Sequence, residues 1–378
     1  MGAETMSRVS TLADPDRRGF LLLAGLALGA GSGVLAGCSR GAAAAGHQGS
    51  AAGAPATGSP APTVSPAPVA APSAPQAADW QALGRQLSSG RLVTPGSSAY
   101  ASARQLFDPR FDDAHPAGIA YCATPADVSA CLAFVRRFGI PVAARSGGHS
   151  YGGWSTSPGL VIDVSQLNSV SVDPVGRTAR VGAGTLLIDF YRALAAQGQA
   201  VPGGSCPTVG IAGLALGGGV GVVGRLLGLT CDSILAVQIV TADGTIRECS
   251  QTSEPDLFWA CRGGGGGNFG VVTSFTFRTH PAPELCLFYL QWPWSQASAV
   301  VSAWQSWAPA ARDELWSNLH LIASAGGSEP AVSVGGTYAG STADAQLLLD
   351  QLYAAVGSQP QSAFLNSQPY LSVMLVEA

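Results

Sequence analysis

Two residues with reactive side chains stand within glycine-rich stretches of this sequence. His149 lies between Gly148 and Ser150, and Cys206 follows two glycines and a serine. Such small neighbours let an imidazole or a thiol approach a ligand closely. A Cys–His hydrolase is one alternative, but its chemistry would not need the surrounding glycines. No second His or Cys lies two to five residues away, the spacing typical of zinc sites, so we expect no metal at either residue.

Three glycine-rich clusters contain or follow these two residues. They span residues 145–153, 202–228 and 262–270. Glycine permits a positive φ and lets main-chain N–H groups gather around an anion. The clusters are flanked by β-branched, strand-like runs rather than by polar linker. We therefore expect them to form a cradle for a pyrophosphate, with flexible surface loops as the alternative. The Walker pattern G-x-x-x-x-G-K-[ST] is absent from the sequence.

The elements that must position these clusters mix strands and helices. The pattern predicts helices over 125–138, 186–197 and 343–356, and strands over 140–144, 160–164, 179–184, 234–240, 245–248, 271–278 and 331–338. Asp243-Gly244 predicts a hairpin turn between the two strands that flank it. The regular βαβ spacing of a Rossmann fold is missing. We therefore predict an α+β fold.

The composition narrows the class of protein. The chain has 378 residues, a net charge of -4 and only 11% charged residues. This length suggests two or three domains, and the low charge argues against a nucleic-acid binder and against a highly charged disordered chain. The content of glycine (49 residues) and proline (25 residues) is above the average for globular proteins. It indicates either low complexity or loops that contact a ligand.

At these glycine clusters the sequence resembles the berberine-bridge-enzyme-like FAD-linked oxidases of the vanillyl-alcohol-oxidase/p-cresol-methylhydroxylase superfamily. The segments that carry the resemblance are 145–150 (RSGGHS), 203–210 (GGSCPTVG), 217–232 and 256–273. The resemblance implies a two-subdomain FAD-binding domain of the p-cresol-methylhydroxylase type. It also implies an antiparallel-sheet α/β substrate domain, which we expect to be incomplete in this chain.

The resemblance also implies roles for individual residues. His149 would bond to the flavin 8α-methyl and Cys206 to flavin C6, which makes the FAD bicovalent. Val209 would occupy the position that controls access of O2, where valine indicates an oxidase; simple packing is the alternative. The other expected FAD contacts are Arg145, Ser146, Gly147, Gly148, Ser150, Gly210, Gly213, Gly218, Gly219, Asn268, Gly270 and Val272.

The sequence departs from this family in two respects. Ser233 stands where an asparagine is expected, and no Tyr-x-Asn, the segment whose tyrosine often acts as the base, occurs after residue 283. The catalytic base is therefore unknown. Tyr338 and Tyr370 are candidates, as are His320 and Glu377, although a structural role is the alternative for each.

The N-terminus predicts export and anchoring. Arg17 and Arg18 precede an apolar run that ends in Leu-Ala-Gly-Cys38, which fits a twin-arginine lipoprotein signal; a plain anchor or an ordinary cleaved signal are the alternatives. We predict a signal over 1–38, an Ala/Pro/Gly/Ser linker over 39–78, the FAD-binding domain over 79–281 and the substrate domain over 282–378. Export also permits disulfides among the remaining cysteines, with buried free thiols as the alternative.

The predicted function is oxidation of an alcohol, sugar or phenol by hydride transfer to covalent flavin, with reoxidation by O2. The aromatic-rich second half suits sugar stacking, and we expect some of its tryptophans to line the substrate-domain sheet. Two alternatives remain: a dehydrogenase that passes electrons to a membrane acceptor, and a non-catalytic flavin-binding lipoprotein. The expected partners are a small-molecule substrate and O2, without nucleic acid, and a membrane only through a lipid on Cys38.

Overall fold

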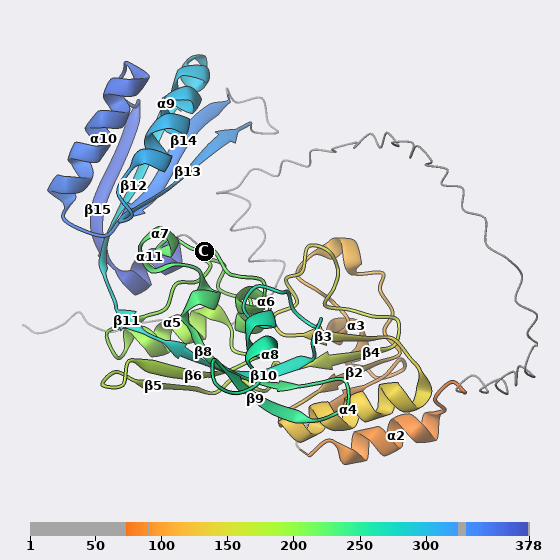
Figure 1. Ribbon diagram of the computed structural model, residues 1–378. Coiled ribbons are helices and arrows are strands. Elements are labelled where there is room, and N and C mark those ends of the chain that lie inside the picture. The colour runs from red at the N-terminus through yellow and green to blue at the C-terminus, as the bar shows by residue number, and fades with distance from the viewer. Residues whose placement is uncertain (1–72, 89–90, 324–329, 377–378) are drawn as a thin grey trace, which may run out of the picture. The chain divides into compact units, whose positions relative to one another are not determined.

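The computed structural model describes residues 73–88, 91–323 and 330–376 (Figure 1). The predicted signal and most of the predicted linker lie outside these residues. Helix α2 (Ala77–Gln86) begins inside the range assigned to the linker, so the folded part starts slightly earlier than predicted. Among the described residues, no helix combines the length and the apolar character needed to cross a membrane.

The first sheet holds the predicted strands that lead into the first glycine cluster. Its order is β1-β2-β4-β3, from β1 (Arg91–Val93), β2 (Gly118–Tyr121), β4 (Leu160–Asp163) and β3 (Val142–Arg145). Strands β2 and β3 run parallel to β4, and β1 runs antiparallel to β2. Short helices α3 (Tyr100–Ala103) and η1 (Pro109–Phe111) follow β1.

Helix α4 (Pro125–Phe138) packs on this sheet, and helix α2 packs against α4. It begins at a capping box, in which the Thr124 hydroxyl accepts a hydrogen bond from the Asp127 N–H and the Asp127 carboxylate accepts one from the Thr124 N–H. It ends at Gly139, whose φ of 61° is favoured by glycine. The helix predicted over 125–138 is therefore confirmed.

The second sheet is antiparallel and has the order β5-β6-β10-β8-β9. Its strands are β5 (Val170–Asp173), β6 (Thr178–Gly182), β10 (Val271–Arg278), β8 (Ile234–Val240) and β9 (Ile246–Ser250). Helices α5 (Leu187–Ala195), α6 (Ile211–Leu216), α7 (Gly224–Leu227) and α8 (Pro255–Ala260), the 3-10 helix η2 (Thr230–Ser233) and the short pair β7 (Gln199–Ala200) and β11 (His280–Pro281) complete this part. Both sheets contribute to one hydrophobic core, which includes Ile162 from β4 and Phe275 from β10.

The third sheet has the order β13-β14-β12-β15. It contains β12 (Glu284–Pro293), β13 (Leu315–Ile322), β14 (Ala331–Tyr338) and β15 (Ser362–Pro369), and β12 runs antiparallel to β14 and β15. The 3-10 helix η3 (Trp294–Gln296) leads into α9 (Ala297–Ala310), which covers one face together with α10 (Thr342–Val356) (Figure 1). The last helix, α11 (Tyr370–Val376), packs in the first core beside α5.

The α+β class is confirmed, and some of the tryptophans line the third sheet as expected, mainly on its helix-covered face. Trp292 is fully buried and Trp307 is nearly so, both in the core between the third sheet and its helices. Trp304 packs against the same core, and its indole N–H donates to the Ser317 hydroxyl at 2.9 Å. These tryptophans stabilise the helix-covered face because a buried indole contributes a large apolar area.

The described cysteines are all free thiols: Cys122, Cys131, Cys206, Cys231, Cys249, Cys261 and Cys286. The sulfurs of Cys122 and Cys131 lie 3.9 Å apart, and both residues are fully buried. Burial raises the pKa of Cys261 to about 12, which keeps its thiol protonated.

Candidate functional site

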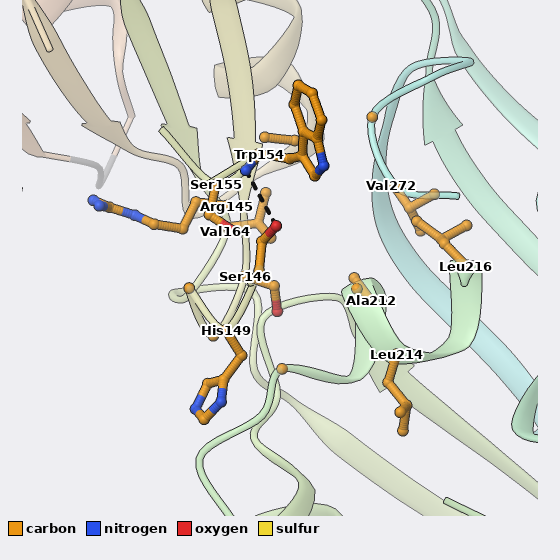
Figure 2. A pocket seen from close by; sticks show the side chains of 18 of the residues that line it. Arg145, Ser146, His149, Trp154, Ser155, Val164, Ala212, Leu214, Leu216 and Val272 are labelled. Carbon is orange, nitrogen blue, oxygen red and sulfur yellow. Dashed lines mark hydrogen bonds between the residues drawn. The ribbon is translucent and has the colours of Figure 1, made fainter. Parts of the chain in front are cut away.

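A cavity of about 690 Å³ lies where the two sheets of the first core meet. This volume is within the range of ligand sites. The end of β3, the loop after it, helix α6 and the loop before β10 form its walls (Figure 2). Its lining residues are Ala144, Arg145, Ser146, Gly147, Gly148, His149, Ser150, Trp154, Ser155, Val164, Val209, Gly210, Ala212, Gly213, Leu214, Leu216, Gly265, Gly266, Gly267, Asn268, Gly270, Val271 and Val272.

His149 is held in place by contacts on two sides. Its Nε2 lies 2.8 Å from the Thr208 hydroxyl, and its ring stacks on Phe107 with 3.8 Å between the ring centroids. The ring is partly exposed and belongs to the cavity wall. The imidazole is thus held in one orientation and is joined to the loop that carries Cys206, two residues before Thr208.

The first two glycine clusters touch each other through their backbones. A Cβ added to Gly147 would meet the Gly210 nitrogen and lie 2.7 Å from the Thr208 carbonyl oxygen. The Ser146 hydroxyl donates to the Ala183 carbonyl at 2.7 Å, which anchors the same loop to the second sheet. Close approach of two main chains therefore requires glycine at both 147 and 210.

Arg145 has a structural ion pair rather than a side chain directed at the cavity. Its Nε lies 2.7 Å from Asp163 Oδ2, and both residues are buried. Figure 2 shows the guanidinium pointing away from the other labelled side chains of the pocket. Its Nη1 has no hydrogen-bond partner among the described residues. The pair joins the ends of β3 and β4, which places the loop at 146–150 at the carboxyl ends of parallel strands, where α/β sheets commonly bind ligands.

In the second cluster, Val209, Gly210 and Gly213 line the cavity and Cys206 does not. The Cys206 side chain is half-buried, and burial raises the pKa of its thiol. The Val209 carbonyl accepts a hydrogen bond from the Leu187 N–H at 2.9 Å, which fixes this loop to helix α5. The structure therefore brings His149 and the loop of Cys206 together, although Cys206 is not among the lining residues.

The remaining predicted residues divide between the cavity and a neighbouring turn. Asn268, Gly270 and Val272 line the cavity, and the Asn268 amide donates to the Gly264 carbonyl at 2.8 Å, which closes the third glycine loop. Gly218 and Gly219 do not line it. Their φ angles of 112° and 83° form a turn that accepts hydrogen bonds from the start of η2.

Several cavity residues were not predicted from the sequence. Trp154 is 80% exposed and stands at the cavity wall (Figure 2). In the sequence, Trp154 stands between Gly153 and Ser155, directly after the first glycine cluster. A large aromatic residue among such small neighbours is the signal that could have identified it. Leu214 and Leu216 on α6, together with Val164 at the end of β4, supply the apolar part of the wall.

The residues of the cavity fit FAD. A Cβ at Gly213 or Gly267 would meet no atom within 4 Å, so these glycines leave room for a group lying against the backbone. None of the lining residues in the described part of the chain carries a carboxylate, which suits a pyrophosphate. His149, Val209 and Gly210 would lie on the flavin side, and the glycine loops would supply N–H donors. Among the described residues, no group of three or more His, Cys, Asp or Glu gathers to hold a metal ion.

The described candidate bases, Tyr338, Tyr370 and His320, do not line this cavity. Tyr338 is 1% exposed and belongs to the helix-covered face of the third sheet, and burial raises its pKa. Tyr370 is 2% exposed and donates to the Val201 carbonyl at 3.1 Å, and burial raises its pKa as well. We therefore assign neither tyrosine as the base. His320 is exposed on β13, and Glu377 lies outside the described residues.

Comparison with known proteins indicates an FAD-binding domain. Residues 116–250 match the family model described as FAD binding domain. The chain is a homologue of FAD-linked oxidases. It is 34% identical over 290 residues to the FAD-linked oxidoreductase YgaK of Bacillus subtilis, with 75% of this chain and 63% of that protein covered. The solved structure of Physcomitrella patens BBE-like 1 has a TM-score of 0.72 and 31% identity, and the match covers 79% of this chain and 64% of that one. The chain thus spans a little under two thirds of these relatives.

Relatives with named activities act on different substrates. Glucooligosaccharide oxidase of Sarocladium strictum is 37% identical over 202 residues, covering 52% of this chain and 40% of that protein. (R)-6-hydroxynicotine oxidase of Paenarthrobacter nicotinovorans is 37% identical over 199 residues, covering 52% and 43%. Two variant structures of Phl p 4 match with a TM-score of 0.67, covering 75% of this chain and 59% of theirs, at 26% and 27% identity. One is a glucose dehydrogenase, and the other, with an additional isoleucine-to-valine change, is a glucose oxidase.

Proposed function

We propose that this protein is an FAD-dependent oxidase that holds its flavin through His149 and Cys206 and oxidises a carbohydrate or a similar bulky alcohol. The observation that carries the proposal is the 2.8 Å contact between His149 and Thr208 at the cavity wall. It joins the imidazole to the loop of Cys206, so the two side chains belong to adjoining loops. A site that bound its ligand through main-chain N–H groups alone would not need an imidazole and a thiol on adjoining loops.

FAD would supply the two-electron acceptor. The carbinol carbon of the substrate gives up a hydride, a base takes the hydroxyl proton, and O2 then accepts the electron pair and two protons to give H2O2. His149 and Cys206 would hold the flavin, and each bond formed in place of a flavin hydrogen would release two electrons that O2 takes up as H2O2.

Val209 supports an oxidase rather than a dehydrogenase. Val209 lines the cavity, and valine leaves more room for O2 than a longer aliphatic side chain would. In Phl p 4, an additional isoleucine-to-valine change accompanies the difference between a glucose dehydrogenase and a glucose oxidase.

The third sheet has a second face, opposite the face that α9 and α10 cover. The residues exposed on this open face support a neutral, hydroxyl-rich substrate. Tyr289 and Phe364 are neighbours across β12 and β15 and are 40% and 46% exposed. Tyr289 and Asn318 both approach Gly335 from this face. The four strands carry a single charged residue, Glu284, at the start of β12. Aromatic rings and carboxamides without charge suit sugar rings and hydroxyls, and a named relative oxidises glucooligosaccharides.

We also propose that the protein is exported and anchored as a lipoprotein. The twin-arginine segment and Cys38 support transfer of the folded, flavin-loaded protein and its anchoring at the outer side of the cytoplasmic membrane. Metabolic labelling with a fatty-acid analogue, with a Cys38→Ser variant as control, tests the anchor.

Anaerobic reduction followed by admission of O2 tests the oxidase. We expect an oligosaccharide or simple sugar to bleach the flavin absorbance, and O2 to restore it rapidly with one H2O2 per flavin. Slow recovery with O2 but rapid recovery with a quinone would identify a dehydrogenase. A flavin that no sugar, alcohol or phenol bleaches would refute the catalytic proposal and leave a flavin-binding protein.

A further inference from the structure

The segment that leads to Cys206 is held by two buried tyrosines. Tyr191 on α5 is 1% exposed, and its hydroxyl donates to the Gly204 carbonyl at 2.6 Å. Tyr370 on α11 is 2% exposed, and its hydroxyl donates to the Val201 carbonyl at 3.1 Å. The two rings meet edge to face, with 6.0 Å between their centroids. The two phenols thus bind the main chain two and five residues before the cysteine.

Both phenols are fixed as donors. Burial raises the pKa of Tyr370, and burial together with the neighbouring Tyr370 raises the pKa of Tyr191. Each hydroxyl therefore keeps its proton at physiological pH. The Val201 carbonyl is buried and the Gly204 carbonyl partly so, and a carbonyl that lost such a donor would be left unsatisfied, which favours displacement of the segment.

The segment is closely packed at Gly203. A Cβ at Gly203 would lie 2.5 Å from the Tyr191 hydroxyl oxygen, and a Cβ at Gly221 would meet the Gly203 carbonyl. On the far side of Cys206, the Ile188 N–H on α5 donates to the Pro207 carbonyl at 3.1 Å. The thiol therefore stands in a short span that is fixed at both ends.

We propose that Tyr191 and Tyr370 are positioning residues that hold the Cys206 thiol for its bond to the flavin. Helix α11 follows strand β15 of the third sheet directly, at Pro369–Tyr370. The contact at Val201 therefore links formation of the second flavin bond to correct folding of the substrate domain. The inference rests on the proposed attachment through His149 and Cys206. The two tyrosine hydroxyls donate to Gly204 and Val201 and not to the loop at 145–150, so their loss acts first on the segment of Cys206 and only through Thr208 on His149.

Peptide mapping by mass spectrometry of Tyr191→Phe, Tyr370→Phe and wild-type protein tests this inference. The readout is the ratio of flavin on the Cys206 peptide to flavin on the His149 peptide. We expect each phenylalanine variant to lower the ratio about tenfold, because a lost buried hydrogen bond shifts a local equilibrium by that order. Tyr353→Phe is the matched control, since Tyr353 is a buried tyrosine of α10 beside Trp292 and lies in the other core; it should keep the wild-type ratio.

The ratio separates positioning from a general loss of structure. A folding defect lowers both attachments and leaves the ratio unchanged, which would overturn the inference, as would wild-type ratios in both phenylalanine variants. Failure of the proposed function is visible separately, because wild-type protein would then carry no flavin on Cys206 at all, and the inference would fall with it.

Discussion

Replacing Gly147 by alanine should force apart the two loops that form the flavin side of the cavity. The new Cβ would lie 2.7 Å from the Thr208 carbonyl oxygen and 3.0 Å from the Val209 carbonyl carbon, and it would also meet the Gly210 nitrogen. Ordinary contact begins at 3.4 Å. All three atoms are main chain, so no side-chain rotation relieves the clash. The loops must move, and the 2.8 Å contact between His149 and Thr208 would be lost.

The cost follows from the packing. Overpacking of this kind costs about 1–3 kcal/mol, which corresponds to a fall in Tm of roughly 2–10 °C for a chain of this size. Gly213→Ala is the matched control, because its Cβ meets no atom within 4 Å and it lies in helix α6, where alanine is favoured by up to about 1 kcal/mol. That methyl group enters the cavity, so Gly213→Ala should keep or raise the Tm and yet lower the flavin content.

Thermal unfolding followed by circular dichroism, with flavin quantified in each sample, measures both effects. Gly147→Ala should lower Tm and flavin content together. Gly210→Ala should do the same from the other side of the contact, and the double variant should cost less than the sum, because loops that have already separated accept both methyl groups. A Gly147→Ala protein with wild-type Tm and full flavin content would refute the reasoning.

Three further predictions concern single side chains. Val209→Leu should slow reoxidation of the reduced flavin by O2 while a quinone still accepts its electrons, as stopped-flow absorbance would show; unchanged O2 reactivity would remove Val209 from oxygen access. Arg225 donates to the carbonyls of Ala308 and Ala311 at the end of α9, so Arg225→Met should destabilise the protein by about 1–3 kcal/mol in urea unfolding, and an unchanged midpoint would contradict this role. Although burial alone would raise the pKa of Asp127, hydrogen bonds from Ser88 and other main-chain N–H groups outweigh it and lower that pKa. Its contribution to stability is therefore present above about pH 4 and lost below, and Asp127→Asn should flatten the acid limb of a Tm-against-pH curve.

The sequence predicted those elements whose own residues reveal which face is buried. Val271–Arg278 alternates apolar and polar residues, and the same span is strand β10 with one face in the core. Strand β12 lacks this alternation because its odd positions Leu285 and Leu287 pack in the first core, while Cys286 and Phe288 pack in the second. Strand β15 is polar and mostly exposed, and its conformation depends on pairing with β12. Such an element gives no local signal.

The site was predictable where glycine has a backbone role and less so elsewhere. The contact of Gly147 with Gly210 explains both residues, but Gly218 and Gly219 have the same sequence appearance and serve a turn against η2. Composition cannot separate these two uses, because both need the same freedom of φ. Tyr370 shows the same limit for side chains: a tyrosine at the surface and one that donates to the Val201 carbonyl in the core look alike until the fold is known.

The attachment of the flavin tests the central claim most directly. The protein is precipitated with acid, washed, digested and analysed by mass spectrometry. We predict that the yellow colour stays with the precipitate and that the peptides containing His149 and Cys206 are joined through a single FAD. A colourless precipitate with free FAD in the supernatant would contradict covalent attachment, and flavin on any other residue would contradict the assignment of these two.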